Sequence, residues 1–218
     1  MKRLIIVCFL LCFPMLATAS GGSIELMKSG YDIHDKDSLR KGAKLYIDSC
    51  ASCHAAKYMR YQRIAKDLEM TDEDVMTNLV RYGATKLSDT IPSAMTAEMG
   101  ETAFGVAPPD LTLEANYRGA DWVYTYLMSF YKDEKASTGY NNHLMPDVAM
   151  PWVLAYAQSS KSEEEFKTEM RDLTNFMVYM AEPIRPYREN MGKYVLGFLV
   201  ILLIPTWLLK NEYWKDIH

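Results

Sequence analysis

Apolar residues recur at helical spacing over much of the chain, and two uncharged apolar runs stand near its ends. One helix face is shared by Leu39, Ala43, Tyr46 and Ile47. Asp37 or Ser38 can cap this helix at its start. The pattern therefore predicts an amphipathic helix that runs directly into Cys50.

The same periodicity predicts further helices over residues 72–82, 121–131 and 162–180, the last one opened by an acidic first turn. Residues 83–113 and 139–151 are rich in proline, glycine and small polar residues, which indicates loops. Few segments alternate with the period of two that marks a strand. The predicted fold class is mostly α.

The first apolar run, Leu4–Leu16, follows a basic start and precedes a small-x-small exit at Ala19. This order is typical of a cleavable secretory signal, so we predict a signal peptide over residues 1–19. The alternative is an uncleaved anchor, but the run is too short to span a bilayer comfortably. Cleavage would remove Cys8 and Cys12 and leave two cysteines in the exported chain.

The second apolar run extends from Tyr194 to Leu209 without a charged residue. At about 1.5 Å per residue it barely crosses a hydrocarbon core of roughly 30 Å. Its C-terminal position favours a single transmembrane helix over residues 191–210 rather than a buried helix of a soluble domain. Export then places residues 20–190 outside the membrane and residues 211–218 in the cytoplasm.

The formal charge of the chain is −4, and loss of Lys2 and Arg3 with the signal lowers it to −6. No clustered basic face indicates a nucleic-acid partner. An acidic exported domain suits a basic soluble partner, because complementary charge raises the association rate.

Cys50, Cys53 and His54 form a C-x-x-C-H sequence, the attachment signature of c-type haem. Two thiols three positions apart on a helical turn can each form a thioether with one vinyl group. The following imidazole is then placed to bind the iron. A thioredoxin-like motif wants a βαβ setting, and a zinc site needs further ligands, so both alternatives fit this context less well.

The sixth iron ligand is less defined by the sequence. Met145 and Met150 each precede a proline in one loop, and a proline-stiffened loop can hold a thioether against iron. His143 in the same loop stays an alternative, whereas His34 closely precedes the haem-attachment helix and His218 lies beyond the anchor. Spacing alone favours Met150 over Met145 only slightly.

Five segments in this order resemble cytochrome c1, the haem-bearing subunit of the cytochrome bc1 complex, or ubiquinol–cytochrome c reductase. The resemblance covers residues 30–218. The segments are KGAKLYIDSCASCHAAKYMRYQRIAKDL, IPSAMTAEMGETAFGVAPPDLTL, YRGADWVYTYLMSFY, NNHLMPDVAMP and a terminal KNEYWKDIH.

The resemblance implies a cytochrome c-like haem domain with one covalent haem c, and roles for individual residues. Met150 matches the axial sulfur that, with His54, binds the iron. Arg118 matches an arginine that pairs with a haem propionate. Pro109 lies in a segment that matches the haem-edge loop. For Tyr124 and Tyr126 we predict core packing.

The resemblance also implies a non-catalytic electron-transfer subunit in a bacterial inner membrane, with its haem domain on the periplasmic side. Its expected partners are a cytochrome b subunit, a Rieske iron–sulfur subunit and a soluble or tethered cytochrome c, in a dimer of the whole complex. Two alternatives stay open. One is another membrane-anchored monohaem carrier or oxidase subunit, and the other is an enzyme or gas sensor with an open sixth iron position.

Overall fold

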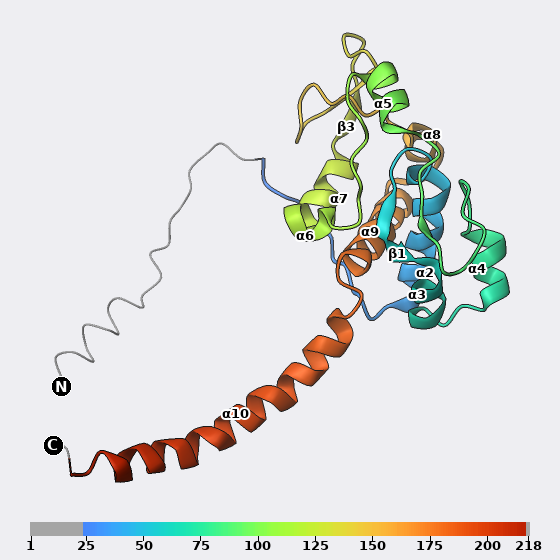
Figure 1. Cartoon of the computed structure of the whole chain (residues 1–218). Coiled ribbons are helices and arrows are strands. Elements are labelled where there is room, and N and C mark those ends of the chain that lie inside the picture. The colour runs from blue at the N-terminus through green and yellow to red at the C-terminus, as the bar shows by residue number, and fades with distance from the viewer. Residues whose placement is uncertain (1–23, 217–218) are drawn as a thin grey trace.

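A computed structural model describes residues 24–216, so the predicted signal peptide (1–19) and His218 lie outside the described residues. A helical domain is followed by one long helix, α10, which projects away from it (Figure 1). The elements, in chain order, are α2 (Lys36–Leu45), the π-helix η1 (Tyr46–Cys50), β1 (Ala56–Arg60), α3 (Tyr61–Asp67), α4 (Asp72–Asn78), β2 (Thr90–Ile91), α5 (Ala97–Phe104), α6 (Glu114–Arg118), α7 (Ala120–Met128), β3 (Phe130–Lys132), β4 (Tyr140–Asn142), α8 (Ala155–Ser160), α9 (Glu163–Ala181) and α10 (Arg185–Tyr213).

The predicted helix before Cys50 is confirmed, and its apolar face from Leu39 to Ile47 is buried. Its cap was predicted two or three residues too late, because the side chain of Asp35 accepts the backbone N–H of Ser38. The last turn widens into the π-helix η1, which ends at Cys50. A π turn at this place rotates the following residues relative to a regular helix.

Helix α9 packs against α2, α6, α7 and α8 and so forms the centre of the domain. It begins with a capping box between Ser162 and Glu165. α2 packs closely across it, with Gly42 at the point of closest approach. A Cβ atom at Gly42 would lie 2.0 Å from the backbone oxygen of Asp172. Beside it, the Ser38 hydroxyl donates to the buried Asp172 carboxylate at 2.7 Å.

α6 and α7 pack against other parts of α9, and two short antiparallel ribbons complete the domain. β1 pairs with β2 next to the C-x-x-C-H turn. β3 pairs with β4 in register, with Phe130 opposite Asn142. The second ribbon leads the chain from α7 into the loop that contains Met145 and Met150.

Several predicted boundaries were wrong. The helix predicted over 72–82 ends at Asn78, and the helix predicted over 121–131 ends at Met128 and is followed by β3. The stretch 83–113, predicted as loops, contains α5, with Thr96 as N-cap and Gly105 as left-handed C-cap. α5 is largely exposed, so it lacks the apolar stripe on which the prediction relied.

α10 has 29 residues, about 43 Å at the helical rise, and so exceeds the sixteen-residue apolar run on which the prediction rested. Within residues 24–216 it is the helix long and apolar enough to cross a membrane. Its apolar side chains from Tyr194 to Leu209 are exposed. Such a surface is stable in lipid and costly in water, which fits a single membrane anchor.

Replacing Gly42 by alanine tests the close packing of α2 on α9. Overpacking against backbone typically costs about 1–3 kcal/mol, more than the roughly 1 kcal/mol that alanine gains in a helix. Gly42→Ala should therefore lower the urea midpoint measured by far-UV circular dichroism in detergent. Gly192→Ala in α10 is the control, because its added Cβ would meet no atom within 4 Å apart from the neighbouring residues and backbone of its own helix. An unchanged midpoint for Gly42→Ala would contradict the packing.

Candidate functional site

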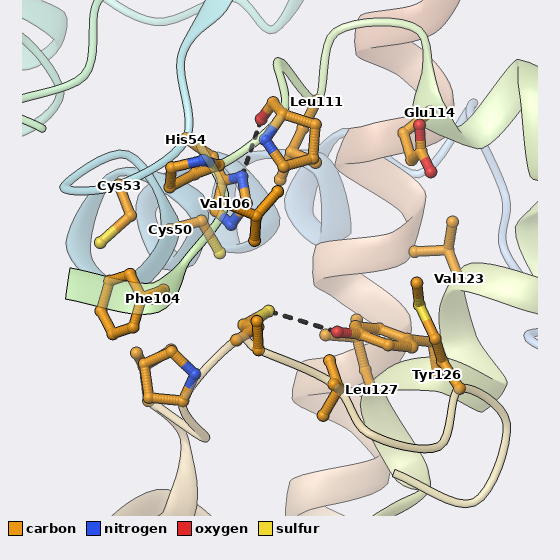
Figure 2. A pocket seen from close by; sticks show the side chains of 18 of the residues that line it. Cys50, Cys53, His54, Phe104, Val106, Leu111, Glu114, Val123, Tyr126 and Leu127 are labelled. Atoms are coloured by element: carbon orange, nitrogen blue, oxygen red, sulfur yellow. Dashed lines mark hydrogen bonds between the residues drawn. The ribbon is translucent and has the colours of Figure 1, made fainter. Parts of the chain in front are cut away.

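An apolar cavity of about 540 Å³ lies between the C-x-x-C-H turn, α7, α9 and the Met150 loop, a size suited to a cofactor. It gathers residues from both ends of the domain (Figure 2). The predicted site residues all line it: Cys50, Cys53, His54, Pro109, Arg118 and Met150.

His54 is oriented by a backbone contact from the loop on the same side of the cavity. Its Nδ1 lies 2.8 Å from the carbonyl oxygen of Pro109. A carbonyl only accepts, so Nδ1 carries the proton and Nε2 keeps a free lone pair. The Asp110 carboxylate fixes this loop by accepting the backbone N–H groups of Lys57 and Thr112.

Burial sets the protonation states on this wall. It lowers the pKa of His54, an effect that the Pro109 carbonyl and the carboxylates of Asp110 and Glu114 oppose. The imidazole is therefore neutral at neutral pH, the form that binds iron. Burial, with a smaller contribution from Cys53, raises the pKa of the Cys50 thiol to about 12. Both thiols are free, with no disulfide between them.

The loop from β4 to α8 brings two methionines to the cavity. Met145 and Met150 both line it, and Met145 is the more exposed of the two, at 43%. The hydroxyl of Tyr126 donates to Sδ of Met150 across 3.5 Å (Figure 2). Burial raises the pKa of Tyr126 to about 12, so the hydroxyl keeps its proton at neutral pH.

The histidine alternatives for a sixth ligand lie elsewhere. The ring of His143 stacks on Tyr131 with a centroid distance of 4.1 Å, on the β3–β4 ribbon. His34 approaches Glu189 at the start of α10, with 4.0 Å between Nε2 and a carboxylate oxygen. Within the described residues, the methionines that line the cavity are Met145, Met150 and Met177, and only the first two come from the predicted ligand loop.

Arg118, at the end of α6, lies on the cavity wall. Its Nε donates to the Glu114 carboxylate at 2.5 Å, and its guanidinium lies 4.3 Å from the centre of the Trp122 ring. The ion pair and the cation–π contact hold a positive charge beside an apolar cavity. A guanidinium in this place can pair with the carboxylate of a bound ligand.

Sequence reasoning missed the aromatic residues that shape the Met150 side of the cavity. Tyr126 was predicted as core packing, but it lines the cavity and contacts the Met150 sulfur. Trp122 stacks on Tyr126, with ring centroids 5.3 Å apart. Trp152 stacks on Phe130 at 4.1 Å, two residues after Met150. The four-residue spacing of Trp122 and Tyr126, which places both rings on one face of α7, was the signal that could have revealed this wall.

The donor set and the walls of the cavity fit a covalently attached haem. Two free thiols lie three positions apart, a neutral imidazole has a free Nε2 lone pair, and a thioether sulfur lines the same apolar cavity. A mostly helical domain with this site and one terminal apolar helix defines a class of protein: a membrane-anchored c-type cytochrome.

Comparison with known proteins narrows the class. The Cytochrome C1 family matches residues 27–217. Cytochrome c1 of Allochromatium vinosum is 42% identical, with all of both chains covered. The mitochondrial cytochrome c1 heme protein of Saccharomyces cerevisiae is 26% identical over 86% of this chain and 69% of its own. A Nitrosomonas europaea protein named ammonia monooxygenase gamma subunit is 40% identical over 96% of both chains.

The chain belongs to the cytochrome c1 family. It is therefore a haem c protein and a haem-bearing electron-transfer subunit of the cytochrome bc1 type, anchored in a membrane and associated with partner subunits such as cytochrome b. The predicted family, cofactor and fold class are confirmed.

Proposed function

We propose that this chain carries single electrons from a Rieske iron–sulfur subunit to a soluble or tethered cytochrome c. Cys50 and Cys53 would hold the haem through thioether bonds, and His54 and Met150 would bind its iron. The haem supplies a one-electron iron couple, and its potential depends on the axial ligands and on burial.

One observation carries the proposal: residues about one hundred positions apart face one apolar cavity. Cys50, Cys53 and His54 lie at the end of η1 and just beyond it, whereas Met150 comes from the loop after β4. Imidazole and thioether are the ligand pair of high-potential c-type cytochromes. Of the two methionines, Met150 is the better candidate, because its sulfur already has a fixed partner in Tyr126.

The protein groups then have distinct tasks. Pro109 selects the His54 tautomer whose Nε2 can bind iron. Arg118 pairs with a haem propionate, and its contact with Trp122 keeps the guanidinium at the cavity wall. The apolar side chains exclude water and favour the less charged ferrous state.

Export of the N-terminal part of the chain determines which side of the membrane each segment occupies. The signal peptide, residues 1–19, is removed, the haem domain (residues 20–190) lies in the periplasm, and residues 211–218 end in the cytoplasm of a bacterial cell. The anchor, residues 191–210, packs beside cytochrome b in a dimer of the whole complex. The acidic exported domain attracts a basic cytochrome c at low ionic strength.

Replacing Met150 by leucine tests the axial pair. The variant keeps an apolar side chain of similar volume but removes the sulfur. The long-wavelength absorption band that marks methionine–iron ligation in the ferric protein should disappear. The midpoint potential should fall by on the order of 0.1 V or more, within the roughly 0.8 V that axial ligands span.

Met145→Leu is the matched control, since Met145 lines the same cavity from the same loop. It should leave the band and the potential unchanged. Loss of the band in Met145→Leu, with a normal Met150→Leu spectrum, would assign the ligand to Met145.

Purification tests the assignment to a complex. Two other assignments can be distinguished in this way: a lone carrier, and a subunit of a monooxygenase like the one named for the Nitrosomonas relative. Solubilisation in mild detergent and affinity capture of the tagged chain should co-purify a cytochrome b and a Rieske protein. Capture of the chain alone would favour a lone carrier, and capture of an ammonia monooxygenase would favour the activity that the relative's name states.

A further inference from the structure

The hydroxyl of Tyr126 contacts the side chain of Met150, the predicted iron ligand. Membership of the cytochrome c1 family does not by itself assign a role to this contact. Oη lies 3.5 Å from Sδ of Met150, a hydrogen bond that Figure 2 marks with a dashed line from Tyr126. A thioether sulfur only accepts, so the phenol is the donor. A hydrogen bond to the sulfur therefore affects how strongly its lone pairs can donate to iron.

The Tyr126 ring is held on both sides by other rings. Trp122, one turn earlier on α7, stacks on it with an interplanar angle of 8°. Phe130, at the start of β3, meets it edge to face at 5.1 Å and 78°. Aromatic pairs in these two geometries are favourable beyond their burial. The ring cannot rotate away from Met150 without losing both contacts.

The acceptor is held by the same row of rings. Phe130 stacks on Trp152 with an interplanar angle of 8°, and Trp152 meets Phe166 of α9 edge to face at 84°. Trp152 is buried and donates its indole N–H to Gln158 at 2.7 Å. Because Trp152 follows Met150 by two residues, the row fixes the loop that carries the sulfur.

We propose that Tyr126 is a positioning residue that orients the Met150 sulfur and weakens its electron donation through this hydrogen bond. The inference rests on the proposed role of Met150 as a ligand. The hydrogen bond uses one lone pair of the sulfur and leaves the other for the metal. Withdrawing density from the sulfur disfavours the ferric state, so the contact raises the midpoint potential.

Tyr126→Phe tests the inference in the detergent-solubilised holoprotein, because it removes the hydroxyl and keeps the ring. A net neutral hydrogen bond corresponds to a change of about three- to tenfold in an equilibrium constant. The ferrous-to-ferric ratio at a given potential should fall by up to that factor, because the bond changes the ratio only through the difference in its strength between the two oxidation states. A tenfold change corresponds to about 59 mV for a one-electron couple. The methionine–iron absorption band should remain but move.

Tyr124→Phe is the matched control, because Tyr124 is buried on the same helix and is not among the residues that line the cavity. Its potential should equal that of the unchanged protein. An equal fall in both variants, or no fall in Tyr126→Phe, would overturn the role of the Tyr126 hydroxyl.

A double-mutant cycle separates this inference from the proposal on which it rests. In the Met150→Leu background, Tyr126→Phe should cause no further change in potential. If Met150→Leu lowers the potential and Tyr126→Phe alone does not, the positioning role fails and the ligand assignment stands. If Met150→Leu changes neither band nor potential, the ligand assignment itself fails.

Discussion

The packing of α2 against α9 is the constraint on which the rest of the domain depends. The two helices come from opposite ends of the haem domain, and Gly42 lets their backbones approach to a distance that no side chain would tolerate. The buried bond between Ser38 and Asp172 fixes one register of the two helices. Because η1 continues α2, the contact between α2 and α9 determines the position of Cys50 at the cavity. Leu173 of α9 lines the same cavity.

Two polar groups orient the predicted iron ligands, and each one makes a hydrogen bond to a single ligand atom. The Pro109 carbonyl holds Nδ1 of His54, and the Tyr126 hydroxyl holds Sδ of Met150. Aromatic stacking from α7 through Trp152 to α9 supplies the rigidity between them. A stiff shell of this kind changes little on oxidation or reduction, which suits an electron-transfer subunit.

Local signals in the sequence predicted the parts of this arrangement that are themselves local. The C-x-x-C-H turn and the acidic start of α9 depend only on neighbouring residues. The choice among Met145, Met150 and His143 depends on the path of a loop, which the stacking of His143 on Tyr131 and of Trp152 on Phe130 constrains. Contacts between residues distant in sequence leave no periodic trace, so the spacing of Trp122 and Tyr126 could indicate a shared helix face but not the contact of Tyr126 with the Met150 sulfur. Exposed α5 was missed because it has caps but no apolar stripe.

We propose that haem is bonded to the two thiols beside His54. Trypsin should release those thiols within the peptide of residues 45–57, between Lys44 and Lys57. Mass spectrometry of the acid-denatured digest should find one haem-bearing peptide, this one, with haem mass added and both cysteines unavailable to alkylation. Haem that separates from every peptide, or that is attached elsewhere in the chain, would contradict the account.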